Sequence, residues 1–201
     1  MKLAFVGPSE GDTDALHRMV ERLLMHFEVD KVVYLGLDDT LDRVMGAWAE
    51  SVFPGGNDER QLVDAAARLA CAGSPGDIDA FLAADRLLER LRAVRRLPSE
   101  TARAVEMVDD RIVTVVYDKA MLNEEDIANS SVLVYGKAAE PFVKRFGPRC
   151  FFTPGPLSHG RFGLVELDAE DQVFLGLFDT HGQPEWREAV QGQRGTRMKV
   201  M

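Results

Sequence analysis

Residues 131–168 read SVLVYGKAAEPFVKRFGPRCFFTPGPLSHGRFGLVELD and carry the clearest structural pattern in the chain. An apolar run at 131–136 ends in Gly136, and a polar turn follows it. An extended piece then leads to the turn TPGPLS, which begins at Thr153, and a further apolar run occupies 162–168. Apolar runs of this length, bounded by glycine, proline and polar residues, predict buried strands joined by loops.

The same pattern continues on both sides of this stretch, so the second half of the chain is expected to be mostly β. Further strands are predicted at 104–108, 111–118, 150–154 and 173–179. The turn-rich DAED at 168–171 predicts a hairpin connection between two of the strands.

The first half begins with a strand–helix–strand pattern. KLAFVG at 2–7 and KVVYLG at 31–36 are short apolar runs that each end in a glycine. Between them, residues 14–27 place apolar side chains on one helical face, with Asp12 or Thr13 as the N-cap. Such a unit favours a parallel strand pair with a right-handed crossover.

Three further helices are predicted at 39–49, 58–72 and 77–96. The segment from about 50 to 105 is therefore expected to be a helical insertion or cap. An apolar stripe at helical spacing is interpreted as core, and it consists of Phe81, Leu82, Leu87, Leu88 and Leu91. We expect one domain over 1–201, with a short, basic, solvated tail from about 185 to 201.

The composition excludes several classes of protein. A formal net charge of -9 and a pI near 5.0 argue against a general nucleic-acid binder. No stretch approaches the roughly 18 apolar residues that a membrane-spanning helix needs, so we expect no membrane partner. Two cysteines and no signal-peptide pattern at MKLAFVG favour a reducing cytoplasm.

The stretch 131–168, together with MKLAFVGPSEGD and DKVVYLGLDD, resembles the calcineurin-like metallophosphoesterases, in particular their compact bacterial phosphodiesterase branch. The resemblance covers residues 1–45 and about 110–183. It implies an α/β fold in which a two-sheet β-sandwich is flanked by helices, in four layers ordered αββα. It also implies a site at the strand ends, where carboxylates, imidazoles and an asparagine hold two divalent metals that activate water.

The residues at the corresponding positions are not those ligands. The family's Asp-x-His, Gly-Asp, Gly-His-x-His and Asn-Pro-Gly-Ser motifs correspond here to PSE at 8–10, Gly36 with Leu37, GKAA at 136–139 and TPGP at 153–156. No histidine stands at 117–119, where the family has one, and LPSE at 97–100 replaces its Gly-Asn-His-Asp loop. We therefore predict no catalytic, metal-binding or cofactor-binding residue of the family's kind.

Five residues are candidates for a vestigial site at this rim: Glu10, Asp38, Asp118, Lys137 and His159. Carboxylates left together without metal would repel one another. The ammonium of Lys137 could replace the metal charge by pairing with one or two of them, or all these groups could be separately solvated. His17, His26 and His181 are interpreted as surface residues.

The leading hypothesis is a non-catalytic binding, regulatory or scaffolding module that recognises a protein partner or a phosphorylated ligand. The alternative is a hydrolase, a metal-dependent phosphoesterase whose altered, carboxylate-rich site uses Glu10, Asp38 and Asp118. Oxygen-only ligands would suit Mg²⁺ or Mn²⁺. A third possibility is a structural homodimer or larger homo-oligomer.

Overall fold

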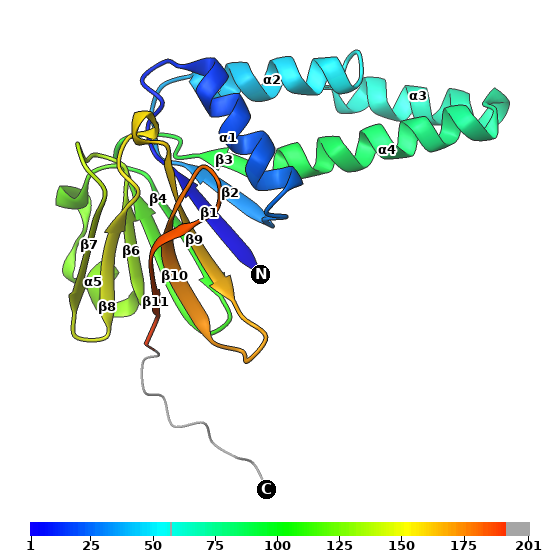
Figure 1. Ribbon diagram of the computed structural model, residues 1–201. Coiled ribbons are helices and arrows are strands. Elements are labelled where there is room, and N and C mark those ends of the chain that lie inside the picture. The colour runs from blue at the N-terminus through cyan, green and yellow to red at the C-terminus, as the bar shows by residue number, and fades with distance from the viewer. Residues whose placement is uncertain (57, 192–201) are drawn as a thin grey trace, which may run out of the picture.

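The computed structural model describes residues 1–56 and 58–191, and the first elements form the expected strand–helix–strand unit (Figure 1). Strand β1 (Lys2–Val6) and strand β2 (Lys31–Tyr34) are parallel neighbours, joined through helix α1 (Thr13–Met25). Asp12 is the N-cap of α1, and its carboxylate accepts a hydrogen bond from the Ala15 N–H at 2.9 Å. The predicted β-α-β unit is confirmed.

Sheet A contains six strands in the order β11-β10-β9-β1-β2-β3. Its remaining members are β3 (Val94–Arg96), β9 (Arg161–Leu167), β10 (Val173–Asp179) and β11 (Pro184–Ala189). Strand β9 runs antiparallel to both β1 and β10, so the sheet is mixed. The turn at 168–171 is the β9–β10 hairpin connection, as predicted.

Sheet B contains five strands in the order β4-β5-β6-β8-β7. They are β4 (Arg103–Val108), β5 (Arg111–Val116), β6 (Val132–Tyr135), β7 (Phe142–Phe146) and β8 (Arg149–Thr153). The central strands β5, β6 and β8 are parallel, and β4 and β7 lie antiparallel at the two edges. The run SVLVYG is a strand in this sheet, as predicted.

The two sheets pack face to face, and helices cover the other face of sheet A. Leu3 and Phe5 of β1 belong to the same core cluster as Val132 and Val134 of β6. The alternate residues of β1 pack in a second cluster with α1 and helix α2 (Thr40–Val52). Burying each such aliphatic or aromatic side chain contributes about 1.5–3 kcal/mol to the free energy of unfolding. The predicted two-sheet α/β fold with flanking helices is confirmed.

Helices α3 (Glu59–Ala72) and α4 (Pro75–Arg92) project from the body as a two-helix arm (Figure 1). A capping box between Ser74 and Asp77 starts α4 directly after the inter-helix turn. Short helices complete the structure: α5 (Glu124–Asn129), and the 3-10 helices η1 (Lys119–Met121) and η2 (Leu157–His159).

Several expectations need correction. Leu82 was expected in the core but is 43% exposed, because the arm leaves part of α4 uncovered. The helix expected to reach residue 96 ends at Arg92, and 94–96 form β3. Residues 185–189, expected to begin the tail, pair with β10 as part of β11, while 192–201 lie outside the described residues. Within the described part, no helix is long and apolar enough to cross a membrane.

Candidate functional site

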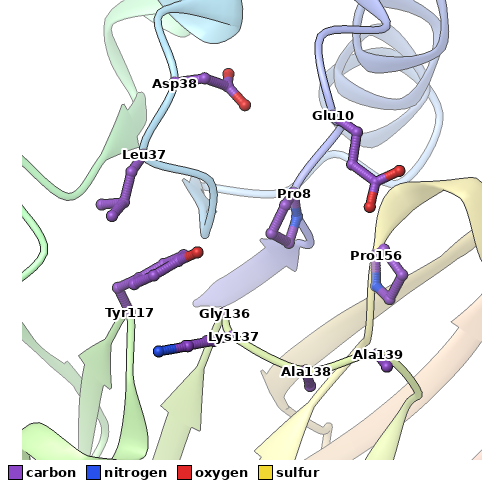
Figure 2. Close-up of a pocket in the computed structure, with 10 residues that line it drawn as sticks. All are labelled: Pro8, Glu10, Leu37, Asp38, Tyr117, Gly136, Lys137, Ala138, Ala139 and Pro156. Atoms are coloured by element: carbon purple, nitrogen blue, oxygen red, sulfur yellow. The ribbon is translucent and has the colours of Figure 1, made fainter.

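The carboxyl ends of parallel strands meet at one end of the sandwich and surround a cavity of about 610 Å³ (Figure 2). The loops after β1, β2, β5, β6 and β8 all contribute to it, because parallel strands bring their carboxyl ends to the same edge. The residues that line the cavity are Pro8, Glu10, Leu37, Asp38, Tyr117, Gly136, Lys137, Ala138, Ala139 and Pro156.

Glycines allow these loops to approach one another backbone to backbone. A Cβ atom on Gly7 would lie 1.7 Å from the carbonyl oxygen of Gly155. A Cβ on Gly136 would lie 2.3 Å from the carbonyl oxygen of Leu35. The Leu157 N–H donates to the Pro8 carbonyl at 2.8 Å. Glycine is therefore required at both positions for steric reasons, and the contacts fix the walls of the cavity.

The buried phenol of Tyr34 ties the first two loops together. Its oxygen accepts from the Ser9 N–H at 2.9 Å and lies 2.8 Å from the Ser9 hydroxyl. Its O–H donates to the Asp38 carboxylate, with oxygen–oxygen distances of 3.2 and 3.3 Å. The Asp38 Oδ1 also accepts from the Thr40 N–H at 3.0 Å. Asp38 is thus held by its own loop and by β2.

This network shifts the pKa values of both acids. Burial raises the pKa of Tyr34 above its ordinary value, the Ser9 hydrogen bonds oppose that effect, and the negative charge of Asp38 adds to it. Partial burial pushes the pKa of Asp38 upward, but hydrogen bonds from Thr40 and Tyr34 outweigh it and leave the pKa below its ordinary value. At neutral pH the phenol is protonated and the carboxylate is ionised.

Two of the predicted carboxylates, Glu10 and Asp38, line the cavity from separate loops, with Pro8 between them in Figure 2. Glu10 has a φ angle of 53°, in the left-handed region that a residue with a side chain seldom adopts. The third, Asp118, is not among the lining residues. Its Oδ1 accepts from the Ala120 N–H and caps η1, and its Oδ2 pairs with Lys137.

The ion pair predicted for Lys137 is present, and Asp118 is its partner. The ammonium lies 2.6 Å from the Asp118 Oδ2. The hydrogen bond from Lys137 lowers the pKa of Asp118, and the same bond raises the pKa of Lys137. The Lys137 side chain is 57% exposed, so solvent screens the attraction.

Lys137→Met is therefore expected to leave the melting temperature unchanged within experimental error. A buried ion pair would lose stability when one partner is removed, whereas an exposed pair contributes little. Thermal unfolding of the two proteins, followed by circular dichroism at neutral pH, checks this. A marked fall in the melting temperature would mean that the pair supports the loop structure.

His159 lies outside the cavity lining. Its Nδ1 is 3.7 Å from the Glu140 Oε2, on the loop between β6 and β7. Within the described residues this nitrogen is buried and has no hydrogen-bond partner. His17, interpreted as a surface residue, packs its ring 4.8 Å from the ring of Trp48. The structure thus brings together Glu10, Asp38 and Lys137 at the cavity, and places Asp118 and His159 beside it.

The sequence interpretation missed the two tyrosines of the site, Tyr34 and Tyr117. The apolar pattern of 31–36 places Tyr34 in a buried strand, and a buried phenol usually needs a hydrogen-bond partner. That requirement was the available signal, because Ser9 and Asp38 follow the two neighbouring strands. Over residues 1–56 and 58–191, no group of three or more histidine, cysteine, aspartate and glutamate side chains is placed to hold a metal ion.

Comparison by sequence finds no matching protein-family model and no matching curated protein. Comparison of structures finds Vps29 from Cryptosporidium parvum, with 12% identity, 94% of this chain and 97% of that chain covered, and a TM-score of 0.52. A single-substitution variant of Vps29 from Entamoeba histolytica gives 12% identity, coverage of 94% and 99%, and a TM-score of 0.51. A predicted phosphoesterase from Streptococcus pneumoniae gives 13% identity, coverage of 94% and 97%, and a TM-score of 0.48. At these identities, the likeness to the two Vps29 structures shows that this chain shares their fold.

Proposed function

We propose that this chain is a non-catalytic binding module on a metallophosphoesterase-like fold, and that the cavity at the strand ends receives a group of its partner. The observation that carries this proposal is the chemistry of the lining. Five lining side chains have no atom that could bind a metal or transfer a proton, namely Pro8, Leu37, Ala138, Ala139 and Pro156. A concave, mostly apolar surface with a few polar groups is typical of a binding pocket.

The polar groups of the cavity do not fit a two-metal centre. Such a centre needs several ligands on two ions a few ångströms apart, including a carboxylate that bridges them. Leu37 stands at the family position of that carboxylate, directly after Gly36. The Asp38 carboxylate is engaged by the Tyr34 hydroxyl and the Thr40 N–H. The Lys137 ammonium lines the cavity and holds the third carboxylate, Asp118, in an ion pair at 2.6 Å.

The alternative is a metal-dependent phosphoesterase that uses Glu10, Asp38 and Asp118 with Mg²⁺ or Mn²⁺. Its support is that two of the three carboxylates, Glu10 and Asp38, share the cavity. Against it, Asp118 is paired with Lys137 at 2.6 Å and caps η1 with its other oxygen. The alternative would require that pair to open before a third carboxylate could join the other two.

The experiment that separates the two is turnover of a chromogenic phosphodiester with Mn²⁺, Ni²⁺ or Zn²⁺ added in turn. We expect no release of the chromophore above the enzyme-free blank, because no histidine is among the lining residues and Leu37 stands in place of the bridging carboxylate. Asp38→Ala and Asp118→Ala are the matched variants. Turnover by the wild-type protein that either substitution abolishes would establish the phosphoesterase instead.

A further inference from the structure

Strand β7 is an edge strand with three exposed apolar side chains. It is the last strand of sheet B, so one side of its backbone has no neighbouring strand (Figure 1). Phe142 is 46% exposed, Val143 is 37% exposed and Phe146 is 51% exposed. Edge strands are normally short or charged, because an exposed apolar edge is a template for pairing with another chain.

The register with β8 shows which side chains share a face. Arg145 is opposite Cys150, and Val143 is opposite Phe152, and both of these β8 residues belong to the core between the sheets. Because side chains alternate along a strand, Phe142, Lys144 and Phe146 point to the other face. There the ring of Phe146 packs edge-on against Phe151, with centroids 5.5 Å apart. The outer face of β7 therefore presents an apolar, a cationic and an apolar side chain in order.

The sequence around β7 is basic, although the chain as a whole is acidic. The net charge of the protein is -9, yet residues 141–165 contain no aspartate or glutamate. The same span contains four basic residues, of which Arg145 and Arg161 pair with Glu188 and Glu185 of β11. Within the described residues, Lys144 and Arg149 are the two that no carboxylate neutralises. The Lys144 ammonium lies 4.7 Å from the Phe146 ring centroid, and within the described residues no carboxylate pairs with it.

From these observations we propose that β7 binds an extended, acidic segment of another protein, which adds to sheet B as a further strand. Backbone hydrogen bonds along the open edge supply the sequence-independent part of the affinity. The outer face supplies selectivity: beside Phe142, Lys144 and Phe146, the segment places an apolar, an acidic and an apolar residue at alternating positions. None of these three residues lines the cavity, so the inference is independent of the proposed function.

Other occupants fit the surface less well. A single-stranded nucleic acid could stack on the two phenylalanines, but it would leave the open backbone edge of β7 unused. A second copy could offer β4, the opposite edge of sheet B, whose Val105 and Met107 are also exposed. Joining unlike edges of identical chains is a head-to-tail contact, which gives a ring or an open filament rather than a two-fold dimer.

The test is selection from a random dodecapeptide display library on the wild-type protein, with counter-selection on the Lys144→Glu, Phe146→Ser double variant. We expect enrichment of peptides in which an acidic residue is flanked two positions away by apolar residues. An enriched peptide should bind the Lys144→Glu single variant about tenfold more weakly than the wild type. When the acidic residue of that peptide is replaced by lysine, its affinity for the Lys144→Glu variant should be restored. On binding, the backbone amides of residues 142–146 should exchange more slowly with deuterium, as strand addition requires.

Melting curves of the variants provide the folding control, since all the changes are at exposed positions. Enriched sequences without the pattern, or binding unaffected by Lys144→Glu, would overturn the proposal and leave Lys144 as a charge that only protects the edge. Binding of an oligothymidylate in place of peptides, or concentration-dependent oligomers that Phe146→Ser disperses, would overturn it in favour of a nucleic acid or a second copy.

Discussion

Gly7→Ala is expected to lower the free energy of unfolding by about 3 kcal/mol or more, which is large for the addition of one methyl group. The new Cβ would lie 1.7 Å from the Gly155 carbonyl oxygen and 2.8 Å from its carbonyl carbon. Both are backbone atoms, so no side chain can rotate away to make room. Relief requires the loops after β1 and β8 to separate, which would break the hydrogen bond from the Leu157 N–H to the Pro8 carbonyl. Urea unfolding of the two proteins measures the difference.

Gly46→Ala is the matched control, because it adds the same methyl group in the interior of α2. Apart from its chain neighbours and the backbone of its own helix turns, a Cβ there would meet no atom within 4 Å. Replacing a glycine inside a helix by alanine stabilises a protein by up to about 1 kcal/mol. Opposite signs for the two substitutions are therefore expected. Equal effects would mean that the loops around the cavity do not approach as closely as the structure has them.

Tyr34→Phe is expected to lower the free energy of unfolding by about 2–3 kcal/mol. The change keeps the ring but removes the oxygen that accepts from the Ser9 N–H and donates to Asp38. The Ser9 groups are buried, so they would remain without a partner rather than turn to water. Tyr117→Phe, at the partly buried cavity tyrosine, is the control and should cost far less. A Tyr34→Phe protein as stable as the wild type would contradict the network.

The same phenol predicts the direction of a pH effect. The folded-state pKa of Tyr34 is raised above its ordinary value of 10.0, chiefly by burial. The folded state therefore favours the protonated phenol, which adds to the free energy of unfolding. This stabilisation is fully present below pH 10 and is lost as the pH rises through the raised pKa. The wild type should lose stability in that range more steeply than Tyr34→Phe. Equal slopes for the two proteins would mean that the Tyr34 phenol is not buried in the folded state.

The parts of the fold that could be predicted are those whose burial leaves a pattern in the sequence. β1, β2, β6 and β10 are continuous apolar runs that end near glycines or turn residues, and all four were expected. β7 and β11 were not, because their residues FVKRF and PEWREA are edge sequences without a simple alternation of apolar and polar side chains. At edges, charged and exposed side chains replace the pattern that burial imposes.

The arm was predicted as helix but not as a projection. Phe81, Leu82 and Leu88 lie at helical spacing, and spacing alone does not tell which turn of a helix meets the body of a protein. Leu88 is buried near the body, while Leu82 is exposed further along α4. Similarly, the sequence placed Lys137 near several carboxylates, but the choice of Asp118 depends on loop conformations that no periodicity encodes.

The most direct test of a non-catalytic site is the metal content of the protein, purified without chelator and without added metal, by inductively coupled plasma mass spectrometry. The same sample should then be dialysed against Mn²⁺ and measured again, beside Asp38→Ala. We predict that Mn, Fe, Ni and Zn remain far below one equivalent in both proteins, before and after dialysis. About one equivalent or more of any of these metals in the wild type, lost in Asp38→Ala, would show a working metal centre and contradict the account.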